Sequence, residues 1–242
     1  MLEKSQAIVL KTTKFKESSL IAQMYTRNHG MQSFMVSGIT SKKKYTKAAL
    51  FQPLNQIELV YYFKNTNSVM RVKELKLVEP YAELHYNVYK SAIATFLQEM
   101  LFKTLRQQEQ ADENMFDFIS NGIHLLDNLD GKYKYFHVHF LVKLTKYLGF
   151  MPMGRFSEGM PYFDFIEGVF TSKEPLHSNF IDGKNAKFLD QLIQCPLTQC
   201  QSLSSYHGEI GTWIQRLIEL YQVHIQNFGK IKSLEVLTEV FE

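Results

Sequence analysis

Four lysines surround one tyrosine in the segment S-K-K-K-Y-T-K, residues 41–47, which follows Gly38. The chemistry open to such a group is electrostatic, because closely spaced ammonium groups repel one another unless an anion or water offsets their charge. Phosphate suits a lysine cluster, since lysine contacts phosphate as a point charge. A loop whose lysines are simply solvated is the alternative, and the segment alone does not decide between the two.

The lysine segment belongs to a basic part of the chain. Residues 1–80 contain 13 Lys or Arg and 5 Asp or Glu, a balance of +8, whereas residues 81–242 have a balance of −5. This asymmetry indicates a polyanion-binding part joined to a part with another role. Aromatic residues lie between the basic ones, as in surfaces that hold single strands by phosphate contacts and base stacking. We therefore predict nucleic-acid contacts at Lys11, Lys14, Lys16, Arg27, Lys42, Lys43, Lys44, Tyr45, Lys47, Arg71 and Lys73.

The aromatic residues of this basic part include Phe15, Tyr25, Phe34 and Tyr45. An aromatic side chain is more often a core residue than a stacking platform, and we expect Phe34 in particular to face inward. Tyr45 has polar neighbours, so we expect its ring to be exposed and able to stack on a base. Lysine outnumbers arginine here, which favours phosphate contacts over base readout and predicts binding to any base sequence.

Sequence motifs of enzymes are not found. Gly154 and Gly159 have the glycine spacing of a P-loop, but Met160 stands where the phosphate-binding lysine is needed. A glycine-rich dinucleotide fingerprint and a G-x-S-x-G nucleophile elbow are also missing. We predict that the protein is not an enzyme and that it uses no cofactor.

Metal-binding spacing is not found either. His137 and His139 are two residues apart on a predicted helix, so their rings point to different faces. Cys195 and Cys200 have no second Cys or His pair at the spacing of a zinc site, and we expect two buried free thiols.

The elements that must position the basic residues change character near Pro80. Before it, runs rich in β-branched and aromatic residues alternate with turn signals such as Asn28-His29-Gly30. Five such runs in about eighty residues predict an OB-fold, which is a five-stranded barrel. An SH3-like barrel or a small sandwich is the alternative. The predicted strands are residues 6–15, 20–27, 31–36, 54–63 and 69–78.

After Pro80 the apolar residues follow a helical spacing. The region 149–180 interrupts this pattern with several Gly and Pro residues, and Gly149 is expected to end the preceding helix. The predicted fold is therefore α+β, with an OB-fold barrel in residues 1–80 and an all-helical domain in 81–242 that contains an irregular insert. The predicted helices cover residues 84–105, 112–126, 136–148, 188–193 and 210–221.

Nothing in the sequence predicts export or a membrane span. Charged residues interrupt the first sixteen positions, so a secretory signal is not expected. No apolar run approaches the roughly 20 residues that cross a bilayer. Two cysteines are too few for a disulfide framework, and we expect the reducing cytoplasm.

Several stretches in order along the chain resemble the RecO family of bacterial recombination mediators and DNA-annealing proteins. The resemblance is strongest over residues 7–81 and weaker after about residue 150. The similar stretches are IVLKTTKFKESSLI (8–21), TRNHG (26–30), VSG (36–38) with a basic stretch after it, ALFQPLNQIEL (49–59), KELKLVEPY (73–81) and KYLGF (146–150).

This resemblance implies an N-terminal OB domain that binds single- and double-stranded DNA, followed by a helical domain. It also implies three partners: the C-terminal tail of SSB, the mediator RecR and, indirectly, the recombinase RecA. Many members of the family have a four-cysteine zinc site after the third helix, but residues 149–180 contain no cysteine here. Zinc is therefore not expected.

The SSB tail is an acidic peptide that ends in an apolar residue, so it needs an apolar pocket beside a cation. Candidate cations are Arg106, Lys132, Lys143 and Lys146. Two other classes of protein remain open from the residues alone: an RNA-binding OB protein, such as a subunit of a translation or tRNA-processing complex, and an interaction scaffold.

Overall fold

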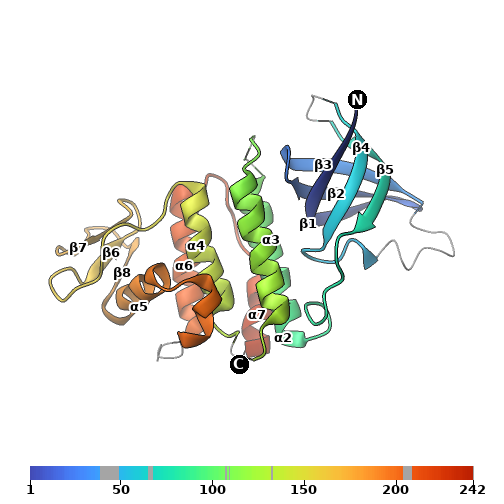
Figure 1. Ribbon diagram of the computed structural model, residues 1–242. Helices are drawn as coiled ribbons and strands as arrows, with labels where there is room; N and C mark the ends of the chain where they lie inside the picture. The colour runs from blue at the N-terminus through green and yellow to red at the C-terminus, as the bar shows by residue number, and fades with distance from the viewer. Residues whose placement is uncertain are drawn as a thin grey trace. The chain divides into compact units, whose positions relative to one another are not determined.

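The computed structural model describes residues 1–38, 49–64, 68–106, 108, 110–131, 133–203 and 209–241 (Figure 1). The chain forms two compact units, of which the first contains Met1–Asn128 and Ile231–Glu242 and the second contains Leu129–Lys230. The change from strands to helices falls near residue 80, as predicted, because the last barrel strand ends at Leu77 and the next helix begins at Val88. The division of roles between residues 1–80 and 81–242 stays a prediction.

The first unit begins with a closed five-stranded barrel in the order β1-β2-β3-β5-β4, which confirms the predicted OB-like architecture. Neighbouring strands pair antiparallel except β3 and β5, which pair in parallel at Phe34–Met70 and Met35–Arg71. The β1–β4 pair closes the barrel. The strands are β1 (Leu2–Lys16), β2 (Ser19–Thr26), β3 (Gly30–Ser37), β4 (Gln56–Tyr62) and β5 (Met70–Leu77).

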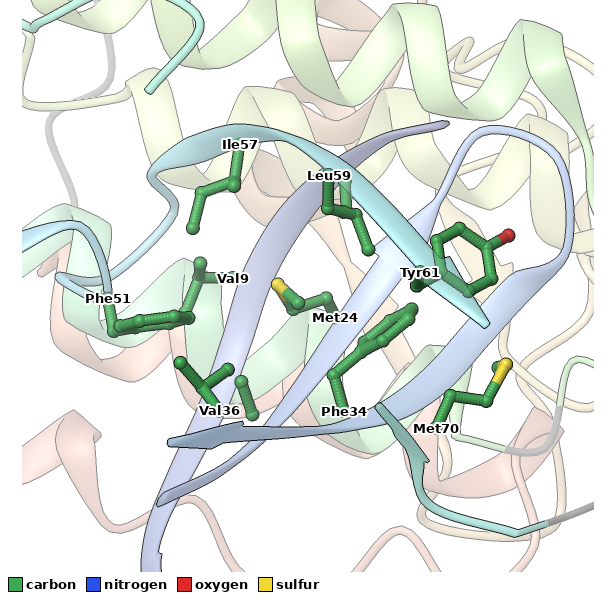
Figure 2. Close-up of a cluster of buried hydrophobic side chains, with 11 residues drawn as sticks. Val9, Met24, Phe34, Val36, Phe51, Ile57, Leu59, Tyr61 and Met70 are labelled. Atoms are coloured by element: carbon green, nitrogen blue, oxygen red, sulfur yellow. The ribbon is translucent and has the colours of Figure 1, made fainter. Parts of the chain in front are cut away.

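The barrel interior is filled by alternate residues of its strands, as the period of a strand requires. Phe34 is fully buried, as predicted, and meets Tyr61 edge to face with 5.1 Å between ring centroids. Figure 2 shows these two rings beside Met24 and Met70 in the barrel interior. Burial raises the pKa of the Tyr61 hydroxyl, and the nearby Glu3 carboxylate adds to the effect. The rings of this core are therefore unavailable to a ligand.

The predicted connection Asn28-His29-Gly30 joins β2 to β3. Gly30 has φ +62°, a left-handed conformation that favours glycine. The Thr26 hydroxyl donates to the Gly30 carbonyl at 2.9 Å and accepts the N–H of His29 at 3.1 Å, so the turn is held from both sides.

Among the described residues, the first unit also contains the helices α2 (Val88–Leu105), α3 (Glu113–Asn128) and α7 (Ser233–Phe241). Figure 1 shows α7, near the C-terminus, beside α2, and the two helices are in contact. Glu99 of α2 holds the start of α7 by accepting the backbone N–H of Lys232 and both the N–H and the hydroxyl of Ser233. These hydrogen bonds lower the pKa of Glu99, against the opposing effect of burial. The last residues of the chain thus fold with its first half.

A buried polar cluster fixes the segment between barrel and helices. The Asp127 carboxylate accepts the backbone N–H groups of Ala82, Glu83 and Leu84 at 2.7–2.9 Å. Lys90 is only 1% exposed, and its ammonium donates to the Asp127 carbonyl and to the Glu83 carboxylate at 2.7 and 2.6 Å. A buried charge is tolerated only when it is paired and hydrogen-bonded. These contacts therefore specify one path for the chain from β5 into α2.

The second unit combines helices with a small sheet. Gly149 ends α4 with φ +83°, as predicted from the sequence. Three short strands in the order β7-β6-β8 lie within or beside the segment predicted as irregular. Each has three residues, which is too short for a period of two to be seen in the sequence. The elements are α4 (Phe136–Leu148), β6 (Tyr162–Asp164), β7 (Val169–Thr171), β8 (Phe180–Asp182), α5 (Gly183–Gln194), η1 (Leu197–Ser202) and α6 (Ile210–His224).

Two histidines and two cysteines of the second unit lie in or near its core, where burial and hydrogen bonds to the backbone define their environment. Burial lowers the pKa of His137 to about 3 and that of His139 to about 4. His139 Nε2 lies 2.9 Å from the Cys195 carbonyl, to which it donates. Cys200 is buried as expected, but the expectation was wrong for Cys195, which is half-buried. Its thiol lies at the end of α5, near the surface, 3.5 Å from the carbonyls of Pro196 and Gln199.

Within the described ranges, no group of three or more His, Cys, Asp or Glu is placed to hold a metal ion. No helix in the same ranges combines the length and the apolar character that crossing a membrane requires.

Candidate nucleic-acid interface

The hairpin of β1 and β2 extends past the closed part of the barrel. Residues 11–18 are all exposed, although 11–16 still belong to strand β1. A strand that covers the core on one face would alternate between buried and exposed residues. The hairpin tip, which we define as residues 11–19, is thus accessible on both faces, and it carries Lys11, Lys14 and Lys16.

Two irregularities shape this hairpin. The register between β1 and β2 shifts between Val9 and Lys11 and again between Lys14 and Lys16. Lys14 pairs with Leu20 and Lys16 with Ser19, so Phe15 is the extra residue of the second bulge. Bulges bend a strand and re-aim a side chain. The Phe15 side chain is 51% exposed, and the Lys16 ammonium lies 5.6 Å from the centre of its ring.

Arg71 lies on the outer face of the same sheet. Thr13, Ile21, Met35 and Arg71 are register neighbours on four adjacent strands. At about 4.8 Å between strands, the backbones at Thr13 and Arg71 are roughly 14 Å apart. Tyr62 pairs with Arg71 on the next strand and is 45% exposed. The register therefore places Arg71 on the same face of the sheet as Thr13 of the hairpin.

Gly38 is the last described residue before the four-lysine segment, and it contacts the hairpin tip. Its N–H donates to the Ser18 carbonyl at 2.8 Å. The five predicted contact residues of this segment lie outside the described residues: Lys42, Lys43, Lys44, Tyr45 and Lys47.

Arg27 lies at the other end of β2. The strand separates it from the hairpin turn by roughly 25 Å, at about 3.3 Å per residue. Its guanidinium forms a bidentate ion pair with Asp117, a second contact with Glu113 at 3.2 Å, and lies over the ring of Phe116. The carboxylates, Asp117 foremost, raise the pKa of Arg27. The structure does not bring Arg27 together with the hairpin tip.

Other basic residues of the barrel also have partners. The Lys11 ammonium lies 4.8 Å from the centre of the Phe102 ring on α2, and Lys73 lies 3.6 Å from the Glu74 carboxylate. Lys4 and Lys76 both pair with Glu58 and lower its pKa, Lys76 having the larger effect. Among the ion pairs that the described part of the chain shows, none involves the three cations of the hairpin and its neighbour, Lys14, Lys16 and Arg71.

Family models cover both parts of the chain. The model described as "Recombination protein O N terminal" matches residues 1–81, and the one described as "Recombination protein O C terminal" matches residues 85–235. The chain belongs to the RecO family. The resemblance seen in the sequence is thereby confirmed over most of the chain.

Full-length relatives agree with the family match. The protein named "DNA repair protein RecO" from Phocaeicola vulgatus is 33% identical over 242 residues, with 100% of both chains covered. Proteins of the same name from Bacteroides fragilis and Flavobacterium psychrophilum are 34% and 35% identical, with 100% and 98% of each chain covered. The chain is therefore a DNA repair protein of this family.

Phe15 and Tyr62 are two exposed aromatic residues of the barrel. Phe15 was named among the aromatic residues of the basic part, but its exposure was not predicted, and Tyr62 was not singled out. Alternation could have found Tyr62, because Tyr61 is buried and the next residue of a strand faces outward. Phe15 could not be found in this way, since a bulge changes the alternation at its position. Tyr25 has a core role instead, and burial raises the pKa of its hydroxyl to about 12.

Proposed function

We propose that this protein binds single- and double-stranded DNA through the outer surface of its barrel and anneals complementary strands during recombinational repair. The observation that carries the proposal is that Lys14 and Lys16 on the hairpin and Arg71 on the neighbouring sheet surface are exposed and belong to no ion pair among the described residues. Cations outside an ion pair are free to neutralise phosphate, whereas a cation in an ion pair must first give up that partner.

The proposed mechanism is physical rather than chemical. Lysine and arginine side chains displace condensed counterions from the phosphates, and the release of these ions supplies affinity without regard to base sequence. Neutralisation of both backbones lets two complementary strands approach, and base pairing then provides specificity. No catalytic residue is needed for this sequence of events.

The proposed partners are the C-terminal tail of SSB, RecR and, through them, RecA. Such contacts would bring the protein to SSB-coated DNA and assist loading of the recombinase, in the cytoplasm and near the nucleoid. Of the candidate cations for the SSB tail, Lys143 donates to the Ile193 carbonyl at 2.6 Å, whereas Lys146 is exposed. We therefore favour Lys146 over Lys143 as the cation that meets the acidic tail, and Arg106 and Lys132 stay candidates beside it.

Strand annealing of complementary oligonucleotides coated with SSB tests the proposed function. We expect the full-length protein to accelerate annealing, and we expect this acceleration to decline as salt rises, because phosphate contacts weaken with salt. Failure to accelerate annealing of either bare or coated strands would contradict the proposal.

Competition between labelled single-stranded DNA and RNA of equal length distinguishes the proposed DNA-binding function from the alternative of an RNA-binding protein. We expect DNA to compete at least as well as RNA. Clear preference for RNA would favour the alternative, and binding to neither would favour an interaction scaffold.

A further inference from the structure

We propose that Phe15 is a stacking platform for an unpaired base, which makes the hairpin tip the element that distinguishes single-stranded DNA from duplex. This inference rests on the proposed function, because it requires that DNA reaches the hairpin. It goes further by assigning one residue, one type of contact and one form of DNA.

The exposure of Phe15 has no explanation in the packing of the barrel. Full burial of a phenylalanine side chain is worth about 1.5–3 kcal/mol, so core-facing aromatics are normally covered. Phe34 and Tyr25 follow this rule and are fully buried. Phe15 instead lies where β1 extends beyond the core, between residues that are all exposed.

The bulge explains how the ring is presented. Phe15 has no Cα partner on β2, while its two neighbours are paired with Leu20 and Ser19. Because Phe15 is the extra residue of the bulge, it interrupts the regular alternation of side chains along β1. Its side chain is therefore not confined to the face of the sheet that alternation would assign to it. The backbone on both sides remains held in the hairpin, so the ring stands on an ordered support.

The charges around the ring select the ligand. Lys14 and Lys16 flank Phe15 in the chain, and the Lys16 ammonium lies 5.6 Å from the ring centre. An aromatic face between cations fits one nucleotide, whose base stacks on the ring while the phosphates on either side meet the ammonium groups. In a duplex the bases are stacked on each other, so the ring has no free base to meet.

A lipid surface is a second anionic partner, and the hairpin suits it less well. Stable attachment to a bilayer needs a broad apolar face in addition to basic residues. The tip offers one aromatic ring, and its neighbours in the chain are the polar residues Thr13, Lys14, Lys16 and Glu17. The area of one ring matches one base and is small for insertion among lipids.

The test uses the full-length protein with Phe15→Ala, and Tyr86→Ala as the matched control. Tyr86 is 82% exposed and lies between β5 and α2, away from the hairpin in the sequence. Binding is measured against an oligo(dT), a duplex of equal length and an oligomer of abasic sites with the same number of phosphates. Thermal melting of each variant checks the fold.

We expect Phe15→Ala to weaken binding to oligo(dT) by about 5- to 100-fold, the range for loss of one stacked base. Binding to the duplex and to the abasic oligomer should stay within twofold of wild type. The slope of log affinity against log salt should not change, because no charge is removed. Phe15→Trp should restore the affinity, and Tyr86→Ala should match wild type throughout.

The outcomes separate the two proposals. If the wild-type protein binds none of the three ligands, the proposed function fails and this inference fails with it. If wild type binds DNA but Phe15→Ala binds oligo(dT) equally well, only the role of Phe15 is overturned. An equal loss on all three ligands would also overturn it, since the ring would then support the hairpin rather than a base. Wild-type binding to phosphatidylserine vesicles that is lost in Phe15→Ala would assign the ring to lipid instead.

Discussion

The closed part of the barrel shares two of its five strands, β1 and β2, with the hairpin tip, but the two regions use similar residues in opposite ways. In the closed part, Phe34 and Tyr25 are buried, and Arg27 at the end of β2 is held by Asp117 and Glu113. In the hairpin tip, Phe15 is exposed and Lys14 and Lys16 belong to none of the ion pairs described for the barrel. The difference shows that residue type does not decide whether a basic or aromatic side chain serves the fold or a ligand; its neighbours do.

The largest expected effect is a difference in the free energy of unfolding between alanine variants of two phenylalanines, one buried and one exposed. Phe34→Ala should lower the free energy of unfolding by about 3–5 kcal/mol, because it leaves a cavity in the barrel core. Phe15→Ala should change it by no more than about 0.5 kcal/mol, as is usual for an exposed side chain. Chemical denaturation of both variants measures the difference, and similar losses would show that Phe15 is a core residue after all.

The four-lysine segment should have the next largest effect. Replacement of Lys42, Lys43, Lys44 and Lys47 by alanine removes up to four phosphate contacts. The slope of log affinity against log salt for single strands should fall by as much as about 3, at roughly 0.7 per contact, with the fold unchanged. An unchanged affinity and slope would show that these lysines are simply solvated.

The hairpin surface should give a similar but smaller change. The triple variant Lys14→Ala, Lys16→Ala, Arg71→Ala should reduce the salt slope by about 2. A control with the same loss of charge replaces three exposed lysines of the second unit, Lys173, Lys184 and Lys187. If the control reduces affinity as much as the triple variant, net charge rather than this surface governs binding.

Acid should destabilise the protein through the buried histidines of the second unit. The pKa of His139 is about 4 in the fold and 6.5 when exposed, so the unfolded state binds more protons between these values. Stability is therefore complete above about pH 6.5 and declines as the pH falls toward 4. Thermal melting at pH 7.5, 6 and 5 should show a falling midpoint, and His139→Gln should show a shallower fall. If the melting midpoint of His139→Gln fell with pH as steeply as that of the wild-type protein, His139 would not contribute to the acid destabilisation.

Arg27 should show the smallest effect. Arg27→Ala should cost about 0.5–1 kcal/mol of stability, since its ion pairs are partly exposed and such pairs contribute little. Because Asp117 and Glu113 already neutralise it, we expect less than a twofold change in DNA affinity. Arg27→Lys keeps the charge and serves as the control. If Arg27→Ala lost as much DNA affinity as Lys14→Ala, the expected difference between the paired Arg27 and the unpaired Lys14 of the hairpin tip would be wrong.

The strands, the turn at Gly30 and the helix end at Gly149 could be predicted because local rules decide them. Alternation, a left-handed glycine and a helical spacing are each visible within about ten residues. The small sheet of the second unit could not be predicted, since its strands have only three residues each, too few for a period of two to be seen. The joining of α7 to the first unit likewise depends on Glu99, more than 130 residues away.

By itself, the sequence determined the basic character of the first eighty residues, the five-stranded barrel and the family to which the chain belongs. Only the tertiary structure decided which of the predicted cations and aromatics are accessible. Charge and strand propensity are properties of a residue and its immediate neighbours, whereas exposure depends on what the rest of the chain places beside it. The carboxylates of α3 hold Arg27, and a bulge with no core behind it presents Phe15, because folding brings distant segments together at one position and leaves the other open to solvent.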